Sequence, residues 1–111
     1  MNDCLFCKII AEKIPSKIEY QDEEVIVFHD INPKAPVHLL IVPKEHIKNL
    51  NDFSKKEKNL GDKLLLTAKK MAEKMKLKQS GYRIIINNGQ DAGQEVNHLH
   101  LHLLGGKKLK F

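Results

Sequence analysis

Hydrophobic and polar positions alternate most strictly near the end of the chain, where histidines at 98, 100 and 102 are separated by leucines. Strict alternation is typical of a half-buried β-strand, because successive side chains of a strand point to opposite faces. We therefore predict a strand over residues 97–104, ended by the glycine pair at 105–106. Its leucines would anchor it in a core, and its three imidazoles would line the other face.

Four more apolar segments, each bounded by turn residues, predict further strands. They cover residues 18–21, 25–28, 38–42 and 82–87. Asp22 and Glu23 separate the first two, and Pro36 and Pro43 bound the third. The short spacing between these strands is typical of hairpin-like, antiparallel connections.

Two segments have helical spacing instead. Residues 5–12 carry apolar side chains in a helical pattern ahead of Pro15, which predicts a short helix. A long helix is predicted to begin at Ser54, because Ser54 and Glu57 form a capping-box pattern before an apolar stripe that continues to Met75. The predicted fold class is therefore α+β: an antiparallel five-stranded sheet with a short N-terminal helix and one long helix.

Length and composition predict one globular domain over residues 1–111, with 41% hydrophobic and 30% charged residues. The net charge of +5 comes mainly from dispersed lysines, and Arg83 is the only arginine. A nucleic-acid platform would need arginines interleaved with aromatic residues, so we expect no nucleic-acid partner but a general attraction for small anions. No signal-peptide pattern and no apolar run of membrane-spanning length occurs, so we expect a cytoplasmic location and no membrane partner.

The histidine segment follows a polar loop that predicts an anion site. Gly89 and Gly93 would let main-chain N–H groups approach an anion beside the imidazoles. This arrangement suits attack on phosphorus, with His100 as the nucleophile because it has a histidine on each side. Its other ring nitrogen would need an acceptor, for which a backbone carbonyl is suitable. Two alternatives stay open: a catalytic zinc held by the three histidines, and histidines that merely face solvent.

Cys4 and Cys7, the only cysteines, are spaced C-x-x-C. In a reducing compartment this spacing indicates half of a metal site, a redox pair, or two reduced thiols without a ligand. A closed zinc site would need two more ligands from elsewhere in the chain. His46, which lies outside the histidine cluster, and His98, which begins it, are the candidates.

The segment from His98 to Leu104 resembles the H-φ-H-φ-H-φ-φ signature of the histidine triad proteins, where φ is apolar. The likeness covers most of the chain. It includes residues 6–15, the stretch 28–36, His38, residues 43–47, Asn87 and residues 93–94. Together these residues resemble the zinc-binding bacterial type of the nucleoside phosphoramidase (Hint) branch.

The resemblance implies a HIT-like fold and a hydrolase that removes a substituent from the α-phosphate of purine nucleoside 5′-phosphoramidates. The reaction would pass through a covalent nucleotidyl-histidine. By resemblance, His100 is the nucleophile among the catalytic residues His98, His100, His102 and His38, and His38 sits behind it to orient it. Asp30 would bind the ribose, and phosphate contacts would come from His102, Asn87 and the backbone near Gly93, Gln94 and Glu95. The base would lie in an apolar slot formed by Leu5, Phe6, Ile9, Phe28, His29 and Ile31.

The resemblance also implies a homodimer with sheets joined across the interface, and a structural zinc on Cys4, Cys7, His46 and His98. Two departures affect the active site. Glu95 stands where some relatives have serine, and the tail 107–111 is short and lacks tryptophan, so the leaving group stays undefined. Three other functions remain open: a nucleotide-binding regulatory module with little turnover, a dinucleoside polyphosphate hydrolase, and a hydrolase with zinc on the triad.

Overall fold

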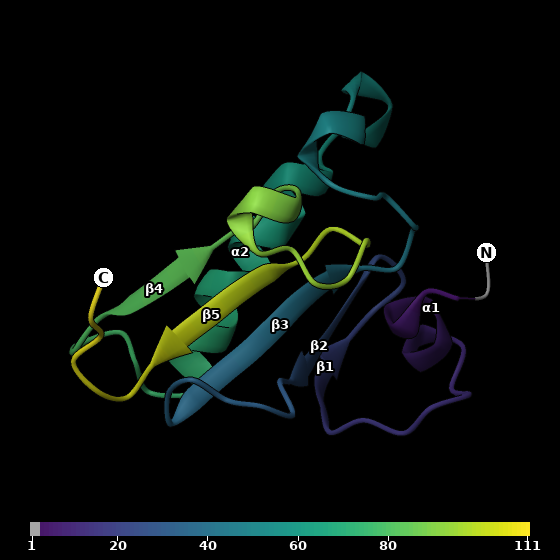
Figure 1. Cartoon of the computed structure of the whole chain (residues 1–111). Coiled ribbons are helices and arrows are strands. Elements are labelled where there is room, and N and C mark those ends of the chain that lie inside the picture. The colour runs from purple at the N-terminus through teal and green to yellow at the C-terminus, as the bar shows by residue number, and fades with distance from the viewer. Residues whose placement is uncertain (1–2) are drawn as a thin grey trace.

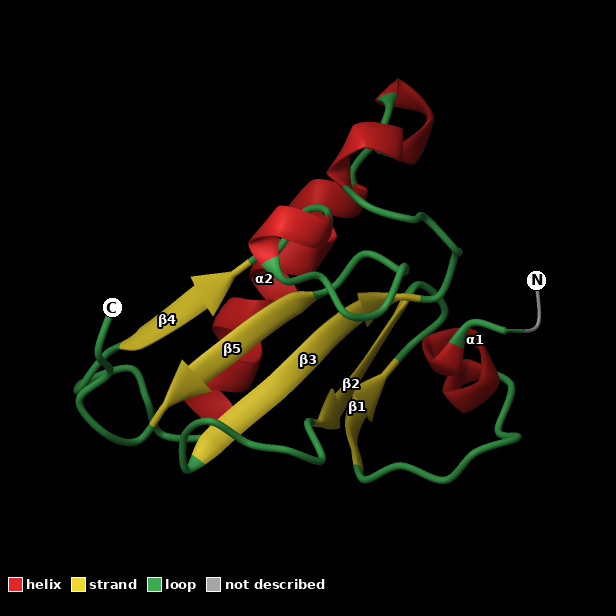
Figure 2. Ribbon diagram, in the orientation of Figure 1, coloured by secondary structure: helices red, strands yellow, loops and turns green. Residues whose placement is uncertain are grey.

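The computed structural model describes residues 3–111, and its centre is one antiparallel five-stranded sheet (Figures 1 and 2). The strand order is β1-β2-β3-β5-β4. The strands are β1 (Ile18–Gln21), β2 (Val25–His29), β3 (Val37–Pro43), β4 (Tyr82–Ile85) and β5 (Leu101–Gly105). The helices are α1 (Leu5–Ile10) and α2 (Leu60–Lys74), with short 3-10 turns η1 (Leu50–Asp52), η2 (Lys55–Glu57) and η3 (Gln90–Ala92). The predicted α+β class and strand number are confirmed.

The two faces of the sheet are covered differently. In Figure 1, α2 lies behind the sheet, while α1 stands at the β1–β2 side. The leucines that alternate with the histidines point toward α2, where Leu99, Leu101 and Leu103 join the larger core. A smaller core on the other face is built around Phe6 and Phe28. The histidine face is therefore left without a covering helix along β5.

Polar contacts join α2 to β1. Lys63 Nζ lies 2.7 Å from Asp22 Oδ2, and Lys74 Nζ lies 2.8 Å from Glu19 Oε2. Asp22 also accepts a 2.7 Å hydrogen bond from the Tyr20 hydroxyl. These contacts link α2 to β1 and to the turn that follows it. No helix within residues 3–111 is long and apolar enough to cross a bilayer.

The long helix begins later than the sequence predicts. Ser54 and Glu57 do form a capping box, but it closes the 3-10 turn η2. Asn59 then adopts a left-handed backbone with φ of 69°, and α2 begins at Leu60. A left-handed residue cannot continue a right-handed helix, and asparagine tolerates this conformation better than most residues. The predicted start at Ser54 is therefore wrong, because the turn η2 and the left-handed Asn59 precede the first residue of α2.

The histidine strand is also shorter than predicted. Ladder pairing of β5 with β3 begins at Leu101, and residues 97–100 precede it without strand pairing. The Leu99 N–H instead donates to the Ile47 carbonyl at 2.6 Å, beyond the end of β3. Side-chain alternation nevertheless continues, because Leu99 packs in the α2 core. The alternation of histidine and leucine thus predicts correctly which face each side chain takes. It does not predict correctly how many residues pair with β3.

Candidate active site and metal centre

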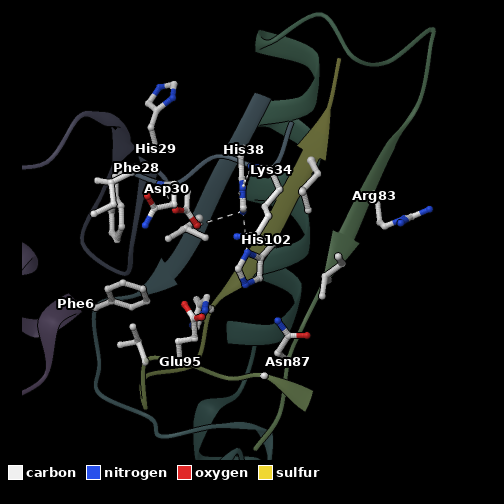
Figure 3. A pocket seen from close by; sticks show the side chains of 18 of the residues that line it. Phe6, Phe28, His29, Asp30, Lys34, His38, Arg83, Asn87, Glu95 and His102 are labelled. Atoms are coloured by element: carbon white, nitrogen blue, oxygen red, sulfur yellow. Dashed lines mark hydrogen bonds and ion pairs between the residues drawn. The ribbon is translucent and has the colours of Figure 1, made fainter. Parts of the chain in front are cut away.

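A cavity of about 1060 Å³ lies on the sheet face opposite α2 (Figure 3). α1, β2, β3, β4, the η3 loop and the C-terminal tail all contribute to its walls. Most of the predicted nucleotide-binding residues line it: Leu5, Phe6, Ile9, Phe28, His29, Asp30, Ile31, Asn87, Gly93 and Glu95. His38, His100 and His102 line it as well. The structure therefore brings together residues that are almost a hundred positions apart.

One end of the cavity is apolar. The rings of Phe6 and Phe28 meet edge to face with centroids 5.3 Å apart, and both are buried. Leu5 and Ile9 from α1 complete this end together with Leu40 from β3. A flat aromatic base can bind in such a slot, because its faces and edges can pack against the aromatic rings that line it.

His100 is held with one ring nitrogen bound and the other bare. Its Nδ1 lies 2.7 Å from the His98 carbonyl oxygen, which can only accept, so we assign the proton to Nδ1. Nε2 then carries a lone pair. The ring is 6% exposed and packs against the edge of Phe6 with centroids 5.0 Å apart. Burial lowers the pKa of His100, so the nucleophilic form is the one present near neutral pH.

A chain of hydrogen bonds sets the tautomer of His102. The Lys34 main-chain N–H donates to His38 Nδ1 at 3.0 Å, so His38 must carry its proton on Nε2. That Nε2–H points at His102 Nδ1, 2.9 Å away, and makes it an acceptor. His102 therefore presents an N–H at Nε2. Burial, with repulsion from His100 and His38, lowers the pKa of His102 to about 4, so this ring is a neutral donor.

This relay changes the place expected for His38. By resemblance it would stand behind His100, but its hydrogen bond runs to His102, and Asp30 Oδ2 lies 3.4 Å from the same Nε2. The orienting partner of His100 is instead the His98 carbonyl. His38 thus acts on the neighbour of the candidate nucleophile.

The relay also bears on a metal held by the triad. Donor atoms of Asp30, His38 and His102 lie within 4.8 Å of one another. A metal there would need a lone pair on His38 Nε2, yet the Lys34 N–H occupies the lone pair of Nδ1 and leaves the proton on Nε2. His98 also turns its Nδ1 toward the cysteines, not toward His102. The three triad imidazoles do not converge on one point.

The second cluster matches a tetrahedral metal site. His46 Nδ1 and His98 Nδ1 are 3.2 Å apart, and the nitrogen-to-sulfur distances to Cys4 and Cys7 are 3.3, 3.4 and 3.6 Å. Ligand atoms around a tetrahedral zinc, with Zn–N near 2.05 Å and Zn–S near 2.3 Å, lie about 3.3–3.6 Å apart. The cluster Cys4, Cys7, His46 and His98 can therefore hold a metal such as zinc without rearrangement.

Local structure prepares this cluster. Cys4 caps α1, and its Sγ accepts from the Cys7 N–H at 3.4 Å, so both sulfurs lie on one turn. His98 Nε2–H donates to the Pro43 carbonyl at 2.7 Å, which leaves Nδ1 as the ligand atom. Burial and the neighbouring Cys4 raise the pKa of the Cys7 thiol to about 11. The Cys7 thiol therefore stays protonated at neutral pH in the absence of a metal, so metal binding would release its proton.

Three predicted binding residues take other positions. The His29 ring turns away from the cavity (Figure 3), and its Nε2–H donates to Glu19 Oε1 at 2.8 Å. Ile31 is 85% exposed at the rim. Gln94 does not line the cavity, because its amide accepts from the Gly89 N–H and donates to the Lys48 carbonyl, both at 2.8 Å. It braces the loop.

Glycine is required at two positions of that loop. Gly89 and Gly93 have φ of 92° and 86°, which side-chain-bearing residues rarely adopt, and they bracket the η3 turn. The sequence predicts that these glycines allow main-chain N–H groups to approach an anion closely. The structure adds that the turn could not close without them.

The residues that sequence reasoning missed are mostly basic. Lys34 and Arg83 line the cavity, as do the tail lysines at 107, 108 and 110. Lys34 follows Pro33 in a stretch already assigned to the site, so its neighbours gave a signal. For Arg83 the only signal in the sequence is strand alternation, which puts it on the same face as Ile85 and Asn87.

Comparison with known proteins gives a consistent match. A model of the HIT domain matches residues 11–109. A relative named "Uncharacterized HIT-like protein", from Buchnera aphidicola subsp. Baizongia pistaciae, is 53% identical over 95% of this chain and 94% of its own length. The purine nucleoside phosphoramidase of Escherichia coli K12 is 44% identical over 96% of this chain and 90% of its own length.

Solved structures agree with these relatives. A HIT family hydrolase from Clostridium thermocellum has a TM-score of 0.96 and 47% identity, covering 99% of this chain and 96% of that one. A histidine triad protein from Clostridium difficile has a TM-score of 0.95 and 45% identity, covering 100% and 96%. With the family model spanning nearly all of the residues, this chain belongs to the HIT domain family of histidine triad proteins.

Proposed function

We propose that this protein is a nucleotidyl hydrolase that removes the substituent from the α-phosphate of purine nucleoside 5′-phosphoramidates by covalent catalysis at His100. One observation carries the proposal: His100 lines the cavity, and the His98 carbonyl oxygen, 2.7 Å from Nδ1, assigns the proton to that nitrogen and the lone pair to Nε2. The HIT family hydrolases among its structural relatives and the E. coli relative named a purine nucleoside phosphoramidase support this activity and the purine preference.

The reaction has two balanced steps. His100 Nε2 attacks phosphorus, and the P–N bond to the substituent breaks. The substituent nitrogen leaves with the bonding electron pair and takes a proton from solvent as a free amine. Water then attacks the phosphorus of the nucleotidyl-histidine and releases one proton to solvent, while the bond to Nε2 breaks and its electron pair returns to the ring. The products are the nucleoside 5′-monophosphate and a neutral His100.

The neighbouring groups supply binding and charge stabilisation. The His102 Nε2–H would donate to a phosphoryl oxygen as negative charge builds in the transition state, held in that tautomer by His38. Asn87 and the main chain near Gly93 would add donors, and Asp30 would accept from the ribose hydroxyls. Removing one such oxyanion donor typically costs about 10²–10³ in kcat.

We propose a structural zinc at Cys4, Cys7, His46 and His98. When bound, zinc would cross-link α1 to the residues that precede β5 and supply no group to the reaction. Its link to catalysis is indirect, because the carbonyl of the ligand His98 is the acceptor that orients His100. This reading favours loss of stability, not immediate loss of chemistry, when the metal is removed.

We also propose a homodimer formed through β4. β4 is an edge strand, and α2 contacts β3 and β5 more extensively than β4. Tyr82 and Ile86 are 40% and 38% exposed at this edge, and Leu65 and Leu66 on α2 are 55% and 63% exposed. An unpaired edge beside exposed leucines fits a second copy that extends the sheet.

Mass spectrometry of a rapidly quenched reaction tests the covalent mechanism. Adenosine 5′-phosphoramidate should add one nucleotide mass to the peptide that contains His100, and His100→Ala should lose both the adduct and hydrolysis. Undiminished hydrolysis by His100→Ala would refute the mechanism. Nucleotide binding by the unaltered chain without product or adduct would instead indicate a nucleotide-binding module.

A further inference from the structure

Basic residues outnumber acidic ones along the cavity wall. Lysine and arginine contribute five of the lining residues, against one aspartate and one glutamate. The carboxylates, Asp30 and Glu95, stand near the triad. The cationic residues form a group that we call the basic sector: Lys34, Arg83, Lys107, Lys108 and Lys110.

Arg83 holds the tail that carries three of these lysines. It lies on β4 opposite Leu104 of β5, two residues beyond His102. Its Nη1 donates to the Lys110 carbonyl at 2.7 Å and contacts the Phe111 main-chain oxygen at 3.5 Å. These contacts hold the end of the tail, whose Lys107, Lys108 and Lys110 are among the residues that line the cavity.

Lys34 brings positive charge close to the chemistry. Its N–H holds His38, and Figure 3 places its side chain beside His38 and His102. Burial is the main cause of the low pKa of His38, and the Lys34 ammonium lowers it further despite the opposing charge of Asp30. Lys34 also lowers the pKa of His102, after burial and the neighbouring histidines. Both effects require the ammonium to lie near these rings.

The order of groups along the cavity assigns a role to this charge. The aromatic slot at Phe6 and Phe28 lies next to His100, and His102 follows at 4.9 Å between ring centroids. Arg83 comes one strand pair further, beside Leu104. With a base in the slot and the α-phosphate between His100 and His102, the substituent on phosphorus extends into the basic sector.

We propose that the basic sector is a subsite for a negatively charged substituent on the α-phosphate, carrying a phosphate or a carboxylate group. This proposal rests on the proposed nucleotidyl hydrolase function and narrows its substrate class. His102, Asn87 and the main chain near Gly93 would already supply neutral donors for the α-phosphate, so five further basic residues along the cavity exceed what that one group needs. Cations at the exit side would bind an anionic leaving group and repel a cationic one.

A matched substrate series tests the subsite. Adenosine 5′-phosphoramidates of propylamine, 3-aminopropanoate and 2-aminoethyl phosphate offer a neutral, a carboxylate and a phosphate substituent of similar length. The variant is Lys34→Gln. The control is Lys78→Gln, which removes the same charge from an exposed lysine outside the cavity. The readout is kcat/KM for each substrate, repeated at high salt.

We expect both anionic substrates to exceed the neutral one, and Lys34→Gln to reduce that preference about two- to fivefold while Lys78→Gln leaves it unchanged. High salt should narrow the preference. A preference for only one anionic substrate would identify the group that binds. Equal rates for all three substrates, or an equal loss with both variants, would overturn the subsite even if His100 still forms its adduct.

A binding measurement keeps the subsite testable if no phosphoramidate is hydrolysed, which would refute the proposed function. Calorimetry should show that ADP binds more tightly than AMP, because its β-phosphate would occupy the basic sector. Lys34→Gln should reduce that difference about two- to fivefold, and Lys78→Gln should not. Equal affinity for ADP and AMP in the unaltered chain would refute the subsite independently of turnover.

Discussion

Removal of the metal from the Cys4, Cys7, His46 and His98 cluster should destabilise the protein strongly. The perturbation is an excess of a zinc chelator, compared with the substitution Cys7→Ala. The ligand atoms already stand at tetrahedral separations, with His46 Nδ1 and His98 Nδ1 3.2 Å apart, so the folded chain can hold zinc without rearranging. The unfolded chain lacks this preformed site, and binding energy therefore becomes folding energy.

The size of the effect follows from linkage. Zinc at a thousandfold excess over its dissociation constant adds about 4 kcal/mol to the free energy of unfolding. For a domain of this length, each kcal/mol moves the midpoint of thermal unfolding by roughly 4 °C. Chelation should therefore lower the midpoint by about 15 °C. The loss should begin at α1, which holds both cysteines.

Thermal unfolding followed by circular dichroism, with and without chelator, measures this shift, and elemental analysis gives the metal content per chain. Cys7→Ala should contain little zinc, unfold at a lower temperature and show almost no further change with chelator. Below the lower midpoint, chelated protein should still hydrolyse substrate. A chelator shift below about 2 °C, or an equal shift in Cys7→Ala, would show that the cluster is not a structural metal site. Immediate loss of activity from a still folded chelated protein would place the metal in the reaction instead.

Two further predictions concern the scaffold. Burial alone would raise the pKa of Asp22, but hydrogen bonds from Lys63, Tyr20 and two main-chain N–H groups outweigh it and lower the pKa. Asp22→Asn should therefore lower the free energy of unfolding by about 1–3 kcal/mol at pH 7, measured by urea unfolding. The difference from the unaltered chain should shrink as the pH falls below about 4, where Asp22 becomes protonated in the unfolded chain but stays ionised in the folded one, and a pH-independent difference would contradict this cause. Gly105→Ala should lower the free energy of unfolding by about 1–3 kcal/mol, because the new Cβ would lie 2.8 Å from Leu77 Cδ1. A double variant with Leu77→Ala should lose less stability than the sum of the two single variants. Strictly additive losses would show that the two sites do not clash.

The pattern of side chains along the chain was sufficient to predict the fold class and the facing of the strands. Alternation in the histidine segment placed the leucines in the α2 core and His100 and His102 on the cavity wall, since the side-chain period of extended backbone does not depend on its pairing partner. The same pattern could not show that pairing begins only at Leu101, because hydrogen bonding depends on where β3 ends. The capping box at Ser54 was likewise read correctly as a cap but assigned to the wrong helix.

The chemical identity of the site was also visible in the residue types, whereas the proton positions were not. The sequence alone indicates imidazole and metal chemistry, through the histidines at 98, 100 and 102 and the pair Cys4 and Cys7. Which nitrogen of each ring carries a proton depends on acceptors and donors from distant segments: the Pro43 carbonyl for His98 and the Lys34 N–H for His38. Those partners are main-chain atoms, which every residue possesses, so no sequence motif marks them.

The basic sector illustrates the same division. The chain's net charge of +5 predicts affinity for anions, but its lysines are dispersed along the sequence and do not indicate where an anion would bind. Only the folded chain brings Lys34 from the β2–β3 loop, Arg83 from β4 and the tail lysines to one cavity. Residue types thus decide which chemistry is available, because functional groups are local. Distance decides which chemistry occurs, because charge interactions and hydrogen bonds between remote segments exist only once the sheet has assembled.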